Sequence, residues 1–146
     1  PLAALLKDDH SQVREVAVEG LGLLGDRNVT KIVSSALNDS DEFVRRAAAE
    51  ALGRLNDDRA VPALKRSLGD SNVNVRIAAV RAIGELKSND AVASLVPLLA
   101  DNTRPQWEDE PICDVVANVL KQIGSPESRA AIRTWQAAKG QTNTGK

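Results

Sequence analysis

The stretch DSDEFVRRAAAEALGRLNDDRAVPALKRSLGD, residues 39–70, contains the unit from which most of the chain is built. It has the pattern of a helix, a turn, a second helix and a second turn, and this pattern returns at a spacing of 31 residues. Four columns in register predict a repeat protein in which each unit packs on its neighbours. The columns are Val13-Arg14, Val44-Arg45 and Val75-Arg76; Gly22, Gly53 and Gly84; Asp8, Asp39, Asp70 and Asp101; and Leu6, Leu37, Leu68 and Leu99.

The first helix of the unit is expected at residues 43–55, because its apolar and small residues recur with helical periodicity. Pro62 fits only in the opening turn of a helix, so the second helix is expected to begin at about Ala60. Pro97 is expected to kink or tighten the corresponding helix of the third repeat. In full, we expect Val-Arg helices at 12–24, 43–55, 74–86 and 111–123, partner helices at 29–37, 60–68 and 91–99, the end of a truncated helix at 1–7, and a final helix at 125–138.

The fourth repeat departs from the pattern. Six residues are inserted between positions 101 and 111, Cys113 stands in the Arg column, and Lys121 stands in the Gly column. Terminal repeats lack a neighbour on one side and are commonly atypical. We therefore expect one domain over residues 1–138, with repeat boundaries near positions 8, 39, 70 and 101, an irregular cap at 101–138, and an unstructured tail at 139–146.

The composition limits the classes of partner. Nineteen basic and twenty acidic residues leave the chain nearly neutral, so no bulk field attracts nucleic acid or an anionic membrane. No apolar run approaches the ~20 residues of a membrane span. The single cysteine excludes an internal disulfide and fits a reducing compartment, so a cytoplasmic location is expected. The sequence opens in mid-pattern and contains no methionine, which is expected of a fragment of a longer chain.

These columns resemble the short HEAT-like repeats of bacterial proteins, the type named after phycocyanobilin lyase subunits. The resemblance covers nearly the whole chain and is carried by Asp39, Val44-Arg45, the run ALGRL at 51–55, and DDRAVPAL at 57–64. It implies an all-α fold, a right-handed α-solenoid of about four helical hairpins plus a C-terminal helix. The Val-Arg helices would line its concave face, and the helices that contain proline would line its convex face.

The resemblance also implies a structural ladder, in which an Asp and an Arg six residues apart bridge neighbouring repeats. The matching pairs are Asp8/Arg14, Asp39/Arg45 and Asp70/Arg76, whereas Cys113 leaves Asp101 without the Arg of its own repeat. The planar fork of an arginine can satisfy loop carbonyls and a carboxylate together. We therefore assign these residues to structure rather than to chemistry.

Candidate catalytic motifs are weak. The run GLGLLG at 20–25 has the spelling of a dinucleotide fingerprint, but it lies at the end of an expected helix, where that motif cannot function. Iron-binding HEAT hydroxylases use paired His-Glu motifs, whereas His10 is the only histidine and is followed by Ser11. His10 and Cys113 are too few for an ordinary zinc site. We expect no metal and no cofactor, with His10 in an exposed turn and Cys113 buried.

The candidate binding residues are those that the Val-Arg helices would place on the concave face. Phe43 and Ile77 are apolar where the pattern favours polar residues, and an exposed Phe43 beside Arg46 and Arg81 could anchor a partner. The alternative is that Phe43 packs back on the next repeat. Trp107, in the inserted loop, could lie at the rim of this face or cover the end of the core, and the second is favoured. The face residues are Gln12, Glu15, Glu19, Phe43, Arg46, Glu50, Arg54, Asn74, Ile77, Arg81, Glu85, Asp114, Asn118 and Gln122.

The leading hypothesis is a non-enzymatic scaffold that binds another protein or a peptide on this concave face. The charges on the face alternate in sign, so nucleic acid is not an expected partner. The alternative, suggested by family kinship, is a subunit of a bilin lyase or of another enzyme-maturation complex. The oligomeric state and the identity of the partner stay open.

Overall fold

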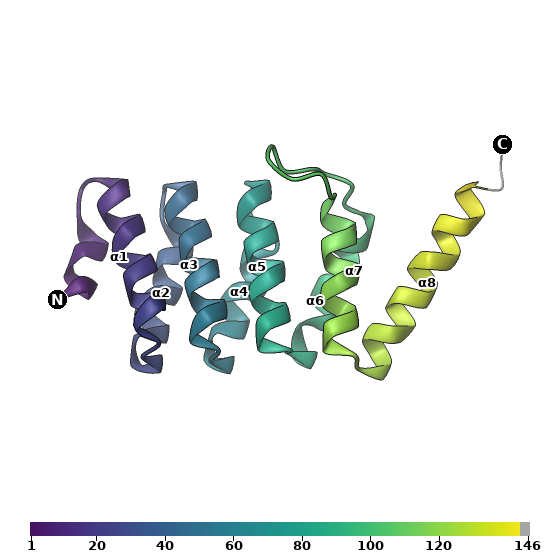
Figure 1. The fold of residues 1–146 in the computed structure, drawn as a ribbon, viewed down its shortest axis with the longest axis horizontal. Coiled ribbons are helices and arrows are strands. Elements are labelled where there is room, and N and C mark those ends of the chain that lie inside the picture. The colour runs from purple at the N-terminus through teal and green to yellow at the C-terminus, as the bar shows by residue number, and fades with distance from the viewer. Residues whose placement is uncertain (144–146) are drawn as a thin grey trace.

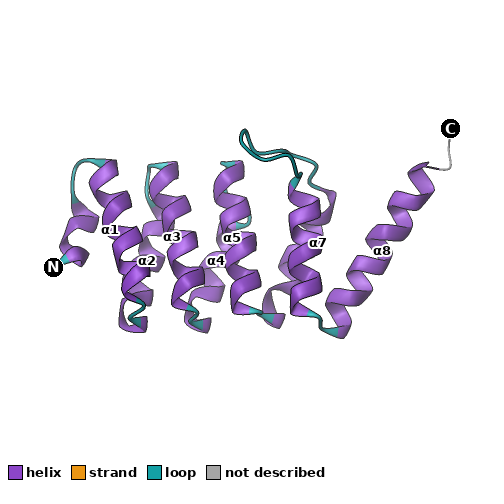
Figure 2. Cartoon of the chain, in the orientation of Figure 1, coloured by secondary structure: helices purple, strands orange, loops and turns teal. Residues whose placement is uncertain are grey.

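The fold is a row of helical hairpins in two layers (Figures 1 and 2). The computed structural model describes residues 1–143, and it contains helices and no strands within that range. The front layer in Figure 1 consists of α1 (Ser11–Leu24), α3 (Glu42–Leu55), α5 (Val73–Leu86) and α7 (Ile112–Ile123). The second layer contains α2 (Thr30–Ser35), α4 (Val61–Ser67) and α6 (Val92–Leu95), and α8 (Pro126–Asn143) follows at the C-terminal end. The predicted all-α repeat fold is therefore confirmed.

The second-layer helices are short, and each follows a 3-10 turn directly, while α2 and α6 also end in one. Pro97 lies at the start of one of these turns, where the α6 helix tightens as expected. The first turns of α1, α3 and α5 begin one residue before their expected positions, which is within ordinary variation at helix ends. The 3-10 segments are η1 (Leu2–Lys7), η2 (Arg27–Val29), η3 (Ala36–Asn38), η4 (Asp58–Ala60), η5 (Asn89–Ala91) and η6 (Val96–Ala100).

Local signals in the sequence fix the ends of the front-layer helices. Asp41 caps α3 by accepting hydrogen bonds from the backbone N–H groups of Phe43 and Val44. Asn72 caps α5 in the same way. At the other end of α3, Asn56 adopts the left-handed conformation that ends a helix, with φ of 49°. These caps set the ends of α3 and α5.

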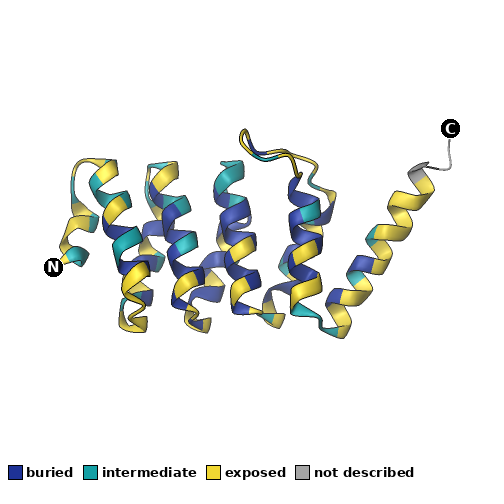
Figure 3. Cartoon of the chain, in the orientation of Figure 1, coloured by how far each residue is buried: buried dark blue, intermediate teal, exposed yellow. Residues whose placement is uncertain are grey.

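The core lies between the two layers and between successive hairpins (Figure 3). Leu52, Leu64, Ile83 and Leu95 are fully buried, and alanines fill the closest contacts. A methyl group added to Gly22 would lie 2.7 Å from the Cβ atom of Ala51, so the glycine column lets adjacent front-layer helices approach closely. Stacking of α1, α3, α5 and α7 thus depends on small residues at fixed positions.

The C-terminal helix is longer than expected. The α8 helix continues to Asn143 instead of ending near residue 138. The Lys139 ammonium lies 4.2 Å from the centre of the Trp135 ring, and it contacts the Asp114 carboxylate at 3.1 Å. The expected tail therefore begins no earlier than residue 144, and residues 144–146 lie outside the described part of the chain.

Candidate protein-binding face

The front-layer helices form one continuous surface, which we call the α1–α7 face. It contains a groove of about 310 Å³ between α3 and α5, bordered by the inserted loop at 101–111. The structure brings seven of the predicted face residues into this α3–α5 groove: Arg46, Glu50, Arg54, Asn74, Ile77, Arg81 and Glu85. Trp107 and Glu108 of the inserted loop, together with two alanines of α5, complete its lining.

The inserted loop is closed at its base by backbone hydrogen bonds. The N–H group of Ile112 donates to the carbonyl of Thr103 at 3.0 Å, and the N–H group of Cys113 donates to the carbonyl of Asp101 at 2.9 Å. Within the loop, the Arg104 guanidinium donates to the carbonyl of Asp109. These bonds make the loop a closed projection at the edge of the face, visible above α5 and α7 in Figure 1.

A bidentate ion pair joins the loop to α5. The Arg81 guanidinium donates to the two carboxylate oxygens of Glu108 at 2.9 and 2.7 Å. Such paired hydrogen bonds fix both distance and orientation. Glu108 was not among the predicted site residues, although the acidic run WEDE at 107–110, in a loop beside the face that carries Arg81, is the signal that could have found it.

The charged side chains of α3 make longer ion pairs than the Arg81–Glu108 pair. Arg46 lies 3.7 Å from the carboxylates of both Glu15 and Glu50, and Arg54 lies 4.0 Å from Glu50. The Arg46 guanidinium also lies 5.8 Å from the centre of the Phe43 ring. These separations exceed those of strong hydrogen bonds, so the α3 side chains can rearrange around a partner at small cost.

The structure corrects two expectations about apolar residues of the face. Ile77 was expected on the binding face, but its exposed fraction is 3%, because it packs with the core behind the groove. Trp107 was expected to cover the end of the core, but 83% of it is exposed, because the closed loop carries it away from the core. Phe43 is 52% exposed and stands free enough to contact a partner.

The remaining predicted face residues lie outside the groove. Asn118 and Gln122 of α7 share a second hollow, of about 320 Å³, with Arg81 and Glu85. Asp114 forms an ion pair with Lys139 at the C-terminal end of the face. Gln12 and Glu19 lie on α1, away from both hollows. The predicted residues thus all lie on the front-layer helices, and those on α3 and α5 line the groove.

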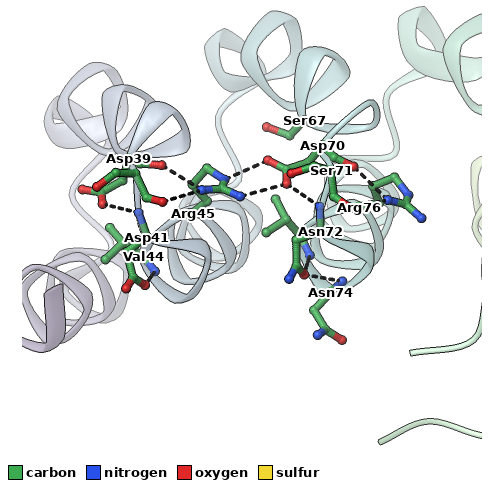
Figure 4. A network of polar contacts seen from close by, with 12 residues as sticks. Asp39, Asp41, Val44, Arg45, Ser67, Asp70, Ser71, Asn72, Asn74 and Arg76 are labelled. Carbon is green, nitrogen blue, oxygen red and sulfur yellow. Dashed lines mark hydrogen bonds and ion pairs between the residues drawn. The ribbon is translucent and has the colours of Figure 1, made fainter. Parts of the chain in front are cut away.

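Arginines bridge successive repeats at one end of the hairpins (Figure 4). Arg14 donates two hydrogen bonds of 2.8 Å to the Asp39 carboxylate, and Arg45 donates two of 2.9 and 3.1 Å to Asp70. Each arginine also donates to two carbonyls of its own loop, as the hydrogen bonds of Arg45 to Asp39 and Ser40 illustrate. The arginine of each repeat therefore binds the aspartate of the following repeat.

The bridge weakens at the third repeat. Arg76 donates to its own loop carbonyls, but its Nε atom lies 3.5 Å from the Asp101 carboxylate and makes no hydrogen bond. Hydrogen bonds from Arg14 hold the pKa of Asp39 below its ordinary value. The pKa of Asp101 is also lowered. Burial acts to raise this pKa, but the hydrogen bonds from Thr103 and the charge of Arg76 lower it by more.

A second polar cluster lies at the opposite ends of the hairpins. The buried Asp57 carboxylate accepts hydrogen bonds from the Thr30 hydroxyl at 2.7 Å and from the Arg59 guanidinium at 2.6 Å. Arg59 also donates to the carbonyl of Arg27 at 2.8 Å. The hydrogen bonds from Arg59 and Thr30 hold the pKa of Asp57 far below its ordinary value. This cluster ties the first two hairpins together.

The remaining candidates for chemistry do not assemble. Burial raises the pKa of the Cys113 thiol, which keeps the sulfur protonated and unreactive near neutral pH. His10 precedes α1 in an exposed turn, where it contacts Asp8 at 3.2 Å. Among the described residues, no three His, Cys, Asp or Glu side chains are grouped as metal ligands. Within the same range, no helix combines the length and apolar character of a membrane span.

The family model for HEAT repeats matches residues 1–73 and 55–108. The chain belongs to the HEAT-repeat family. The resemblance inferred from the sequence is confirmed, and the Arg–Asp contacts of this HEAT-repeat chain have the arrangement that the resemblance implied. A comparison with curated protein sequences found no match.

Solved structures with the same architecture include several repeat proteins. The complex of CpcE and CpcF of phycocyanin lyase from Nostoc sp. PCC7120 is similar over 92% of this chain, with a TM-score of 0.74 and 22% identity. Human deoxyhypusine hydroxylase is similar over 99% of this chain, with a TM-score of 0.62 and 23% identity. This chain spans 62% of the length of the first matched chain and 45% of the second. At these identities the likeness concerns the fold.

A third similar structure comes from a study of the interaction between cadherin and beta-catenin. It matches 91% of this chain with a TM-score of 0.62 and 22% identity, and this chain spans 30% of its length. The same helical architecture therefore occurs in proteins whose described roles differ widely.

Proposed function

We propose that this HEAT-repeat chain is a protein-binding scaffold and that a segment of its partner lies in the α3–α5 groove. The observation that carries this proposal is the position of Trp107, which is 83% exposed at the border of a groove with an apolar wall at Ile77. Exposed tryptophans next to a groove are typical anchors of protein interfaces. The Arg81–Glu108 ion pair supports the proposal because it fixes the loop at one side of the groove.

The charged side chains of the groove and the exposed Trp107 favour a partner segment that carries both polar and apolar side chains. Arg46, Arg54 and Glu50 lie along α3 with long, adjustable separations, while Trp107 offers apolar surface. A partner that places an apolar side chain against Trp107 would bury surface that is exposed in the free chain. A partner carboxylate beside Arg54 would replace a 4.0 Å contact with a shorter hydrogen bond.

The experiment is affinity capture from a lysate of the source organism, with captured proteins quantified by mass spectrometry. The test variant replaces Phe43 and Arg46 with alanine, and a second test variant is Trp107→Ala. A matched control replaces Lys65 and Arg66 of α4, in the other helix layer, with alanine. We expect the control to retain a captured partner and both test variants to lose it. Capture of the same proteins in equal amounts by all four chains would contradict the proposal.

A second candidate function is participation in a lyase complex. The observation that favours it is the similarity to the CpcE–CpcF complex over 92% of this chain. Co-expression with a bilin-acceptor protein and the pigment tests this candidate, because lyase activity would yield a covalent coloured adduct. An uncoloured acceptor in every pairing would remove this second candidate and leave the scaffold proposal unaffected.

A further inference from the structure

A hollow of about 660 Å³ lies between η6 and α8, and we call it the η6–α8 hollow. The α8 helix diverges from the row of hairpins toward its C-terminal end, as Figure 1 shows. Most of the side chains that line the hollow are apolar, and they include Val96, Leu99 and Ala100 of η6 and Ala131, Trp135 and Ala138 of α8. The hollow shares no lining residue with the α3–α5 groove, so it is a separate site.

The equivalent crevice two repeats earlier is small and polar. It lies between the α2–η3 segment and α4, and its volume is about 140 Å³. Its residues correspond to those of the hollow by a shift of two repeats, with the six inserted residues added for α8. The polar residues that become apolar or aromatic include Asn38, replaced by Ala100; Ser67, replaced by Trp135; and Asp70, replaced by Ala138. The hollow therefore depends on residues specific to the last repeat, and stacking of repeats alone does not produce it.

One end of the hollow is polar and carries a positive charge. The Lys139 ammonium contacts a carboxylate oxygen of Asp114 at 3.1 Å, and the Cys113 sulfur lies 3.8 Å from the same oxygen. The sulfur also lies 3.5 Å from the side-chain oxygen of Asn102. This series of contacts places Lys139 and Asn102, which both line the hollow, at the same end of it. Among the described residues that line the hollow, Lys139 alone is charged, so the hollow presents a cation to a ligand.

The Trp135 ring forms a preformed apolar wall. The Lys139 ammonium lies over this ring, 4.2 Å from its centre, and such cation–π contacts hold the two side chains together. Trp135 and Ala131 also pack against the hydrophobic core. Sites for small molecules commonly have volumes of about 300–1,000 Å³ and combine an apolar lining with a few polar groups. The η6–α8 hollow has both properties, with its polar groups gathered at one end.

We propose that the η6–α8 hollow binds a small amphipathic carboxylate, whose apolar chain lies along Trp135 and Ala138 and whose carboxylate pairs with Lys139. The charge of Lys139 selects an anion, because a cationic amphiphile would meet a like charge at the polar end. The apolar lining selects a chain or ring over a polar metabolite, because buried polar groups would lack partners there. The Asp114 carboxylate competes with the ligand for Lys139, so the Lys139–Asp114 contact weakens when the ligand binds.

The test titrates sodium decanoate into the full chain, below the concentration at which decanoate forms micelles, with isothermal titration calorimetry as the readout. In a Trp107→Phe chain, Trp135 is the only tryptophan, so its emission reports on the hollow directly. We expect saturable binding that changes the Trp135 emission, and binding about threefold tighter for each methylene group added between octanoate and decanoate. The absence of saturable decanoate binding would overturn the proposal, and so would equal binding of decyltrimethylammonium.

A matched pair of substitutions on α8 locates the ligand. Ala138→Asp restores the carboxylate that Asp70 contributes to the polar crevice, and it should weaken decanoate binding at least about tenfold. Ala137→Asp adds the same charge one residue away, outside the lining, and should change binding less than about twofold. Both alanines are exposed, so neither variant disturbs the core. Equal weakening by the two variants would contradict the proposal.

Two further substitutions test the role assigned to Lys139. Lys139→Gln should weaken decanoate binding by about fivefold, because it removes the cation that pairs with the carboxylate. Asp114→Asn should strengthen binding, because it removes a carboxylate that competes for the Lys139 ammonium. Unchanged affinity in Lys139→Gln would refute the proposal. If the chain binds no decanoate and Ala138→Asp, but not Ala137→Asp, loses a captured protein, the hollow is a protein-docking site and the proposal is wrong.

Discussion

Replacement of Arg45 by glutamine measures how much one rung of the ladder contributes to stability. The substitution removes two hydrogen bonds to Asp70, of 2.9 and 3.1 Å, and two, of 2.9 and 3.2 Å, to the carbonyls of Asp39 and Ser40. The Arg45 and Asp70 side chains are only 15% and 11% exposed. Breaking a buried ion pair costs about 3–5 kcal/mol, and partial exposure reduces that cost, so we expect a loss of about 2–3 kcal/mol.

Arg76 provides a matched comparison in the same column. It keeps a 2.8 Å hydrogen bond to the carbonyl of Asp70, but its ion pair with Asp101 spans 3.5 Å without a hydrogen bond. Arg76→Gln should therefore cost only about 1 kcal/mol. Arg45→Lys should lose most of what Arg45→Gln loses, because lysine keeps the charge but not the planar fork.

Equilibrium unfolding in urea, followed by circular dichroism, measures these losses directly. For a chain of this size, 1 kcal/mol corresponds to about 2–4 °C in melting temperature, so Arg45→Gln should lower it by roughly 4–12 °C. Arg66→Gln, on the exposed surface of α4, is the control and should change stability by less than about 0.5 kcal/mol. Equal losses in the Arg45 and Arg76 variants, or a loss below about 1 kcal/mol for Arg45→Gln, would refute the reasoning.

Three further predictions concern packing, pH and the exposed loop. Gly22→Ala should destabilise the chain by about 1–3 kcal/mol in urea unfolding, because the new methyl group meets the Ala51 backbone at 2.8 Å, whereas Gly140→Ala, with open space around it, should be neutral or stabilising. The free energy of unfolding should fall as the pH drops below about 4. The pKa of Asp39 is lower in the folded chain than in the unfolded chain, so its ion pair stabilises the fold above the unfolded-state pKa, and this stabilisation is lost as the pH falls through the folded-state pKa. Asp39→Asn should therefore flatten this part of the pH profile. The fluorescence of Trp107, taken as the difference between the unmodified chain and Trp107→Phe, should be quenched strongly by acrylamide, because 83% of Trp107 is exposed. Weak quenching of this difference would contradict the described position of the loop.

The repeating part of the fold could be predicted from the sequence because each element there is specified locally and repeatedly. Helical periodicity and the Gly column fixed the front-layer helices, and the position of Pro62 fixed the start of a second-layer helix near Ala60. The resemblance to HEAT repeats also indicated which Arg and Asp residues belong to the ladder. These features depend on neighbours in the repeat, which the sequence itself displays.

The groove could be predicted only in part, because its border is the segment that has no counterpart in the other repeats. The positions of Arg46 and Arg81 follow from the column pattern, but the contact between Arg81 and Glu108 depends on the path of the inserted loop. That path also decides that Trp107 is exposed at the border of the groove. Neither periodicity nor composition determines the path of a single inserted loop.

The end of the ladder and the border of the groove have one structural origin. In the second repeat the carbonyl of Asp39 is held by Arg45, six positions later. In the fourth, the carbonyl of Asp101 is held by the backbone N–H of Cys113, twelve positions later. This exchange of an arginine side chain for a backbone donor accommodates the six inserted residues, which are then free to extend past α5. The repeat that gives up the ladder arginine thereby supplies the loop that carries Trp107, so the solenoid gains a candidate binding groove where its internal bridging stops.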